Sequence, residues 1–545
     1  MTRIKPQDDW RSGQNFVLLE TVRSDEANRQ NLLFTDPLDI ITCHDPKELT
    51  RCFRQMESYR QKGYYLAGFF SYELGYLLEE SLNTCYQSKD YPLIWLGVFN
   101  RPRTLFRPIA EEGKKFYLSL PVLNISRKEY EKNILIIKEL IASGDTYQIN
   151  YTAKYKFDFW GDVCAFYNSL KERQKVSYSA LINYGGNYLV SLSPELFFRI
   201  NKNRRITVKP MKGTAPQGSG SWLASDEKNK SENVMIVDLL RNDIGRICQP
   251  GSVLVKRLFE IEEYETVQQM TSTVQGRLLP ETGITDIIKS LFPCGSVTGA
   301  PKINSMKIIR SLEQEPRGVY TGAIGYLTPD DTAVFNVAIR TIDLQQTDEE
   351  KYSAQMGIGG GIVADSQPCE EYEECLLKGH FLVKSRPTFA LIETMLCARG
   401  NIKYLAAHLK RLKTSARYFH ISCNATAIKQ DLQKYAAKLP GICRLRLLMD
   451  SYGKISFEHS ALVIPDNASR RIAVSPLRTD SQDLFLRHKT TLRDLYNAEY
   501  KKYEAKGYFD VIFCNEKDEL TEGAISNLFL EKKAAFIRRR LAADC

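Results

Sequence analysis

The sequence predicts an α+β protein of at least two domains, and three observations support this. The chain has 545 residues, which is more than a single hydrophobic core usually serves. Hydrophobic residues make up 43% and charged residues 26% of the chain, as in globular proteins with a large interior. Short strand-like runs and longer amphipathic helical runs alternate in mixed order, which indicates sheets combined with helices.

The pattern along the chain predicts three segments, at 1–120, 121–386 and 387–545. The first alternates short apolar runs such as NFVLLETV with loops that carry Pro or Asp. In the second, KEYEKNILIIKELIASGD predicts an amphipathic helix that ends at Gly144. NYLVSLSPELFFRI and TAVFNVAIRTIDL predict strands, and the glycine-rich GIGGGIVADS predicts a connection to the helix EEYEECLLKGHFLVKS.

A new pattern begins after Pro387, where Arg386-Pro387 favours a helix end or a linker. HLKRLKTSARYF predicts a helix, and FALIETMLC and IFCNEKDELTEGAISNLFL accompany it as parts of a second module. The last residues, EKKAAFIRRRLAADC, have neither strand alternation nor helix capping signals. They predict a frayed tail.

The charge pattern argues against a nucleic-acid or membrane protein. The 75 basic and 65 acidic residues are interspersed, with a formal net charge of +10, and they form no aromatic-basic stripe or zinc-finger spacing. The small excess suits anionic small molecules. The first residues lack a signal-peptide core, and no run of about 18 apolar residues occurs. We therefore expect a cytoplasmic protein.

The segment EEYEECLLKG carries the first chemical signal. Glu371, Glu374 and Lys378 are spaced by three and four residues, so they project from one helix face. Magnesium is usually held by one or two carboxylates together with an anionic substrate, and Glu371 and Glu374 are suitable ligands. The alternative is a solvated helix face with an ordinary Glu-Lys pair.

Two further segments suggest a ligand site. Gly357, Gly359, Gly360 and Gly361 precede the acidic helix, and glycines let the backbone approach a ligand closely, although such runs also occur in plain turns. Lys212 follows Pro210 by two residues and directly precedes Gly213. A desolvated lysine would lose pKa and become nucleophilic, whereas an exposed loop lysine would not.

Seven ordered blocks across 190–380 resemble the chorismate-binding superfamily of anthranilate, aminodeoxychorismate, isochorismate and salicylate synthases. These blocks are SPELFF, PMKGT, SENVMIVDLLRNDIGR, CGSVTGAPK, RGVYTGAIGYL, FNVAIRT and GIGGGIVADSQPCEEYEECLLK. AGFFSYELGY and GDTYQINYT extend the resemblance upstream. It implies an anthranilate synthase component I-like β-sandwich core with flanking helices.

The resemblance implies the aminodeoxychorismate synthase component I activity, because the residue before GT in the PMKGT block is lysine in those enzymes and alanine in anthranilate synthases. Lys212 would attack C2 of chorismate while the C4 hydroxyl leaves, and ammonia would then add at C4 and expel the lysine. Glu195 resembles the general acid and base of the family. Glu232 resembles the third magnesium ligand, beside Glu371 and Glu374.

The substrate contacts implied by the resemblance begin with Arg340, which we expect on the strand FNVAIRT and whose fork suits a carboxylate. Lys378 would neutralise a carboxylate of the acidic helix. The remaining implied contacts are Tyr320, Thr298, Gly359 and Gly360. For Tyr320 and Thr298, ordinary packing is the alternative.

Two departures argue further against anthranilate formation, which is the nearest alternative activity. Asn233 and Gln269 stand where other family members carry histidine. A different alternative is a catalytically idle binding subunit that only retains these residues. Family members take ammonia from a glutamine amidotransferase, and this sequence has no G-x-C-x-G nucleophile block, so we expect that partner to be a separate chain.

The segment 387–545 resembles the fold-type IV pyridoxal-phosphate enzymes, particularly aminodeoxychorismate lyase, which would yield 4-aminobenzoate for folate biosynthesis. Lys489 matches the Schiff-base lysine, Glu522 the partner of the pyridine nitrogen and Arg411 a phosphate contact. The family continues well beyond SNLF, where this sequence has EKKAAFIRRRLAADC. We therefore expect a partial α+β domain that binds pyridoxal phosphate poorly and lacks lyase activity.

Overall fold

The protein is described by a computed structural model and contains two compact units. The structure describes residues 13–22, 31–87, 91–105, 115–216, 220–263, 267–348, 351–384, 389–462, 470–479, 481, 483–532 and 535–538. Unit 1 comprises residues 1–112, 120–159 and 163–385, and unit 2 comprises 113–119, 160–162 and 386–545. The segment boundaries inferred from the sequence, near residues 120 and 386, stay predictions.

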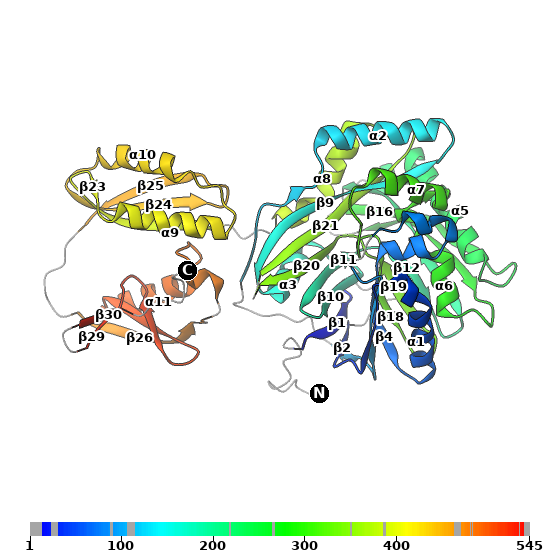
Figure 1. Ribbon diagram of the computed structural model, residues 1–545, viewed down its shortest axis with the longest axis horizontal. Helices are drawn as coiled ribbons and strands as arrows, with labels where there is room; N and C mark the ends of the chain where they lie inside the picture. The colour runs from blue at the N-terminus through cyan, green and yellow to red at the C-terminus, as the bar shows by residue number, and fades with distance from the viewer. Residues whose placement is uncertain are drawn as a thin grey trace. The chain divides into compact units, whose positions relative to one another are not determined.

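Two large sheets form the centre of unit 1 (Figure 1). The first sheet has the order β17 (Gly299–Ala300), β9 (Gln148–Gly161), β21 (Lys351–Ile362), β20 (Thr341–Asp348), β11 (Asn187–Ser193), β10 (Tyr178–Tyr184), β1 (Asn15–Glu20), β2 (Asn31–Thr35) and β6 (Arg103–Leu105), with β8 (Val122–Leu123) paired to β9. The second has the order β14 (Met211–Pro216), β16 (Val267–Arg277), β13 (Arg205–Lys209), β12 (Leu196–Ile200), β19 (Ala333–Val337), β18 (Ala323–Leu327), β4 (Tyr65–Phe70), β5 (Ile94–Phe99) and β3 (Asp39–Cys43), with β15 (Leu254–Glu263) paired to β16.

The inner faces of the two sheets share one hydrophobic core. Val17 and Ile182 of the first sheet belong to the same buried cluster as Phe69 and Trp95 of the second. The Phe69 ring meets Tyr184 of the first sheet edge-on, with ring centroids 5.3 Å apart, a favoured aromatic geometry. The β-sandwich that the sequence predicts for the first module is therefore confirmed.

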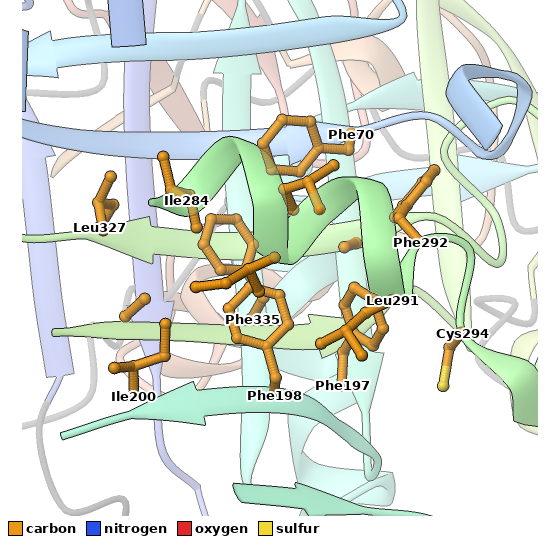
Figure 2. Packing of buried hydrophobic residues seen from close by; sticks show 14 of the residues in the cluster. Phe70, Phe197, Phe198, Ile200, Ile284, Leu291, Phe292, Cys294, Leu327 and Phe335 are labelled. Atoms are coloured by element: carbon orange, nitrogen blue, oxygen red, sulfur yellow. The ribbon is translucent and has the colours of Figure 1, made fainter. Parts of the chain in front are cut away.

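Helices flank the sandwich. They are α1 (Leu49–Gln61), α2 (Arg127–Ala142), α3 (Val163–Arg173), α4 (Gly220–Ser225), α5 (Glu227–Gly245), α6 (Ile284–Leu291), α7 (Lys302–Leu312) and α8 (Pro368–Lys384), with 3-10 turns η2 (Pro46–Glu48), η3 (Tyr72–Leu77), η4 (Glu80–Cys85) and η5 (Gly295–Val297). Figure 2 shows Ile284 and Leu291 of α6 lying over Phe198 and Phe335 of the second sheet. This second core holds α1, α5 and α6 on the outer face of that sheet.

The helix expected before Gly144 is α2, which starts as its sequence predicts. The Ser126 hydroxyl accepts a hydrogen bond from the Glu129 N–H at 3.3 Å, which satisfies one free amide of the first turn. Gly144 follows the helix with a φ of 82°, a conformation that glycine adopts at little cost. In the part of the chain that the structure describes, no helix is long and apolar enough to cross a membrane.

Two expectations about local structure are wrong. The predicted strand TAVFNVAIRTIDL is interrupted, because β19 ends at Val337 and β20 begins at Thr341. Arg340 therefore lies outside both strands, and its φ of 50° is in the left-handed region that ends a strand. The glycine-rich segment is also no connection, because Gly357 to Gly361 lie inside β21.

Unit 2 contains two small sheets with helices. The first sheet has the order β23 (Asn401–Ile402), β22 (Ala390–Ala398), β24 (Ile442–Asp450) and β25 (Ile455–Ala461), and the second the order β26 (Ile472–Thr479), β27 (Asp510–Asn515) and β28 (Leu520–Gly523). The other elements of this unit are α9 (Leu405–Tyr418), α10 (Ala425–Ala436), α11 (Asp494–Glu504), the 3-10 turn η6 (Leu484–Leu486) and β7 (Phe116–Leu118). The expected helix HLKRLKTSARYF is α9, so the α+β class of this module is confirmed.

The end of the described chain also differs from expectation. β29 (Phe529–Lys532) and β30 (Ala535–Arg538) pair as an antiparallel ribbon, so the prediction of a frayed tail is wrong for residues 531–532 and 535–538 of EKKAAFIRRRLAADC. A two-stranded ribbon is held by backbone hydrogen bonds, which do not require side-chain alternation. The rest of that tail lies outside the described residues.

Candidate functional site

Lys212 lies on the edge strand β14, with its side chain only 11% exposed. Its Nζ is 3.9 Å from Glu232 Oε2 on α5. Burial lowers the pKa of the Lys212 amine, and Lys378 adds to this effect, whereas Glu232 and Glu195 oppose it. A lowered pKa leaves more of the amine neutral, which is the nucleophilic form.

The glycines of β21 leave space beside this amine. A Cβ on Gly361 would lie 2.9 Å from Lys212 Nζ and would also overlap the Gln148 amide. A Cβ on Gly360 would lie 3.4 Å from Glu371 Oε2 and 3.4 Å from Lys378 Nζ. The glycines therefore let β21 approach Lys212 on one side and the acidic helix on the other.

The acidic helix of the sequence is α8, and its face is a network of charges and hydrogen bonds. Lys378 Nζ is 2.7 Å from Glu374 Oε1 and donates to the Gly359 carbonyl at 2.9 Å. Glu371 accepts from the Ser366 hydroxyl at 2.6 Å. Burial raises the pKa of Glu371, and Lys378 lowers that of Glu374.

Glu195 lies in the link between β11 and β12 and is 4% exposed. Burial raises the pKa of its carboxyl to about 7, although a hydrogen bond from Ser296 and the charge of Lys212 oppose the rise. Within the described residues, Oε1 has no hydrogen-bond partner. A carboxyl with such a pKa can give and take a proton near neutral pH.

The structure places the remaining predicted contacts as follows. Thr298 is fully buried, and its hydroxyl donates to the Cys294 carbonyl at 3.2 Å. Tyr320 is 9% exposed and packs on Gly357 of β21. Arg340 Nη1 donates to Gln174 Oε1 at 2.6 Å, so its guanidinium has a polar partner in the protein.

The three predicted magnesium ligands are linked by their effects on neighbouring pKa values, but they do not form a group that could chelate an ion. Glu374 and Glu232 both act on the pKa of Lys212, and Glu374 also acts on Glu371. Among the described residues, no three His, Cys, Asp or Glu side chains are close enough to hold an ion. The carboxylates fit magnesium chemically, with Lys212 and Lys378 as their present counter-charges. The magnesium site stays a prediction.

Two side chains of the site have no role assigned from the sequence. Gln148 on β9 is 1% exposed, and its Oε1 has no partner within the described residues. Lys228 on α5 acts on the pKa of both Glu371 and Glu374. The sequence pattern gives no chemical signal for either residue, because Gln148 is an uncharged residue in a strand and Lys228 is one of several charged residues at the start of a helix. Only the fold brings them to the site.

In unit 2, three residues are expected at a pyridoxal-phosphate site, and two of them, Arg411 and Glu522, influence the pKa of the third, Lys489. Burial lowers the pKa of Lys489, and Arg411 adds to this, whereas Glu393 and Glu522 oppose it. The Lys489 carbonyl accepts from the Ile392 N–H of β22 at 2.8 Å, which fixes its backbone. Arg411, expected to bind phosphate, instead holds Glu393 through Nε at 2.8 Å and through Nη2.

Comparisons with known proteins agree with the geometry. The chorismate binding enzyme family matches residues 110–384, and the amino-transferase class IV family matches residues 390–545. An aminodeoxychorismate synthase of Streptomyces pristinaespiralis is 40% identical over 271 residues, which is 48% of this chain and 37% of the relative. Anthranilate synthase component 1 of Synechocystis is 35% identical over 286 residues, which is 50% of this chain and 56% of the relative.

A solved structure agrees as well. Anthranilate synthase component I from Streptococcus pneumoniae has a TM-score of 0.55 and 26% identity, and the match covers 69% of this chain and 94% of that one. The resemblance expected from the sequence is confirmed: the chain belongs to the chorismate-binding enzymes and carries an amino-transferase class IV domain after the chorismate-binding one.

Proposed function

We propose that this chain aminates chorismate at C4 with ammonia and gives 4-amino-4-deoxychorismate. The observation that carries the proposal is the buried amine of Lys212, which lies 3.9 Å from Glu232 and beside the glycines of β21. The name of the Streptomyces relative, aminodeoxychorismate synthase, supports the same activity. The matched segments span only part of the relatives, so the activity is inferred from this site.

In the first step, the neutral Lys212 amine attacks C2 of chorismate. The two ring double bonds shift, the C4–O bond breaks, and the Glu195 carboxyl gives a proton so that the hydroxyl leaves as water. The Glu195 carboxylate then takes the proton that the alkylated lysine nitrogen releases. Its pKa of about 7 suits both directions of transfer.

In the second step, ammonia adds at C4, the double bonds shift back and the C2–N bond breaks. Glu195 protonates the departing lysine nitrogen and takes a proton from the new C4 ammonium group, which restores both residues. The enolpyruvyl group is untouched, so the net change replaces hydroxyl by amine with retention at C4.

Magnesium would be held by Glu371, Glu374 and Glu232, and it would supply positive charge that stabilises the carboxylates of the substrate. The protein contributes a counter-charge of its own, because Lys378 of α8 pairs with Glu374 and donates to the Gly359 carbonyl. Arg340 offers a planar fork for a second carboxylate.

Ammonia would come from a separate glutamine amidotransferase. The solved relative is itself named a component I, and this sequence contains no G-x-C-x-G block. The proposal predicts activity with ammonium salts alone. Activity with glutamine would require the added partner.

The decisive variant is Lys212→Ala, assayed with chorismate, ammonia and magnesium by chromatography. We expect aminodeoxychorismate formation to fall by about 10³-fold or more, because the covalent route is lost. Lys209→Ala is the matched control, since this lysine of β13 pairs with Glu262 at 25% exposure and belongs to no predicted contact. Unchanged product formation by the folded Lys212→Ala protein would refute the proposal.

The same assay addresses the alternatives. Anthranilate is fluorescent, so anthranilate as the main product of the unmodified protein would favour the activity of its structural relative. No turnover with ammonia and magnesium would favour an idle binding subunit.

For unit 2, we infer a pyridoxal-phosphate site at Lys489. The buried amine and the nearby Glu522 carboxylate fit this cofactor, whereas Arg411 would have to share its donors with Glu393. When bound, the cofactor would supply an electron sink, and the absence of lyase activity expected from the sequence stays a prediction. Lys489 would hold it covalently, and Glu522 would keep its ring nitrogen protonated.

A further inference from the structure

A buried ion pair between Glu313 and Arg317 lies behind the proposed substrate contacts. Arg317 Nε donates to Glu313 Oε2 at 2.8 Å, and Nη2 donates to Oε1 at 2.7 Å. The two side chains are 2% and 7% exposed. This two-bonded fork fixes orientation as well as charge, and removal of one partner would leave the other charge buried and unpaired.

The same ion pair also forms hydrogen bonds with the backbone of two segments that are distant in the sequence, β9 and η5. Arg317 Nη1 donates to the Val297 carbonyl of η5 at 2.8 Å, and Nη2 donates to the Asn150 carbonyl of β9 at 2.6 Å. Glu313 Oε1 accepts from the Thr152 amide at 2.9 Å and from its hydroxyl at 2.8 Å. One ion pair therefore sets the distance between β9 and the turn after α6.

Both segments continue directly into the proposed site. The Asn150 N–H donates to the Thr298 carbonyl at 2.8 Å. Gly359 of β21 lies so close to Tyr151 and Thr152 of β9 that a Cβ would overlap the Tyr151 carbonyl. Arg317 Nη1 also donates to the Thr321 hydroxyl at 3.3 Å, next to Tyr320. Three proposed substrate contacts thus neighbour groups that the pair holds.

The position of Arg317 is itself fixed from the other side. Glu73 of η3 accepts from the Arg317 N–H at 2.6 Å and from the Gly318 N–H at 3.0 Å. The guanidinium lies 4.4 Å from the centroid of the Tyr72 ring. A cavity of about 210 Å³, lined among others by Glu73, Glu313 and Arg317, borders the pair. Hydrogen bonds and one aromatic ring therefore hold the Arg317 guanidinium, because the cavity leaves one side of it without packed side chains.

We propose that Arg317 is a positioning residue of the substrate site, which acts through Glu313, β9 and η5 on Thr298, Tyr320 and Gly359. The inference rests on the proposed function, because the contacts that it arranges are the substrate contacts assigned above. Arg317 touches no reacting atom in this account.

The test variant is Arg317→Lys, which keeps the charge but replaces the planar fork by a single ammonium. We expect the dissociation constant for chorismate, measured by calorimetry with magnesium and without ammonia, to rise roughly tenfold or more, since small displacements of contacts are costly. KM should rise likewise, and kcat should change less. Amide hydrogen exchange should accelerate at 148–152 and 295–300.

Two further variants separate positioning from general destabilisation. Lys171→Met breaks an equally buried pair, in which Lys171 Nζ lies 2.5 Å from Glu20 Oε2 at 8% and 1% exposure. It should destabilise the fold without changing chorismate affinity. Thr152→Val removes only the hydroxyl bond to Glu313 and should weaken chorismate binding by roughly twofold to fivefold.

The outcomes are distinct. Unchanged chorismate affinity in folded Arg317→Lys, or an equal loss in Lys171→Met, would overturn the proposal. If Arg317→Lys does not fold, unchanged affinity in Thr152→Val overturns it instead. If the unmodified protein binds no chorismate, the proposed function fails. Hydrogen exchange at 148–152 in Arg317→Lys against Lys171→Met then still decides whether Arg317 positions β9.

Discussion

At the scale of single residues, burial acts in opposite directions on the two proposed catalytic groups. It lowers the pKa of the Lys212 amine and raises that of the Glu195 carboxyl to about 7, because low polarity disfavours either charge. The amine is therefore neutral more often than that of an exposed lysine, and part of the carboxyl is protonated near neutral pH. A nucleophile and an acid require those two forms.

The Glu195 carboxyl makes stability depend on pH. Its pKa is raised from 4.5 to about 7 in the folded protein, so the folded state binds the proton more tightly than the unfolded state. This contribution is complete below pH 4.5 and is lost as pH rises through 7. Glu195→Gln stays neutral at every pH and so avoids the cost of a buried carboxylate, which should make the variant more stable than the unmodified protein at pH 8, by up to about 3 kcal/mol.

Urea unfolding at pH 5 and pH 8 measures this effect, with the 84% exposed Glu227 changed to Gln as the control. The Glu195→Gln variant should also lose about 10²- to 10⁴-fold in turnover. A stability difference between Glu195→Gln and the unmodified protein that is the same at both pH values would contradict the assignment of the pKa.

At the scale of elements, β21 and α8 bring the amine and the carboxylates together. Inside β21, each second glycine faces the same side, and the strand passes both Lys212 and the acidic face of α8. A side chain at these positions would fill the space that we assign to the substrate.

Gly361→Ala tests this arrangement. The added Cβ would lie 2.9 Å from Lys212 Nζ and would overlap the Gln148 amide, so we expect turnover to fall by roughly a hundredfold while the fold is retained. Gly245→Ala at the end of α5 is the control, because nothing lies within 4 Å of its Cβ position. Equal activity of both variants in the ammonia assay would argue against a site beside Gly361.

The sequence predicts those elements whose signals are local. The amphipathic period of α2 and the spacing of Glu371, Glu374 and Lys378 on α8 need no tertiary information. The sequence does not predict the break at Arg340 or the place of the glycines inside β21. A positive φ at an arginine is imposed by the surrounding fold. A run of glycines in a strand also looks the same in the sequence as a run of glycines in a turn.

At the scale of the whole molecule, the family blocks carry most of what the sequence predicts about function. They lie in the order that the family has, so Lys212, Glu195 and the three glutamates could be chosen before the fold was known. Local pattern cannot supply the contacts between distant segments. Gln148 and Lys212, for example, both lie beside Gly361 because β9 pairs with β21.

The two family domains predict that amination in unit 1 and cofactor binding in unit 2 are separable. Lys489→Ala in the full chain should abolish any absorbance change that develops when pyridoxal phosphate is added, because Lys489 is the proposed attachment point. Its amination of chorismate should stay within about twofold of the unmodified protein, since Lys489 belongs to unit 2. A large loss of amination in a folded Lys489→Ala protein would show that amination depends on the cofactor site.

The central claim is the covalent role of Lys212, and quenched-flow mass spectrometry tests it most directly. The protein is mixed with chorismate and magnesium without ammonia, quenched with acid and digested. We predict that the peptide with Lys212 gains the mass of chorismate less one water, and that this gain disappears when ammonia is present. An unmodified Lys212 peptide during active turnover, or an adduct on another lysine, would contradict the account.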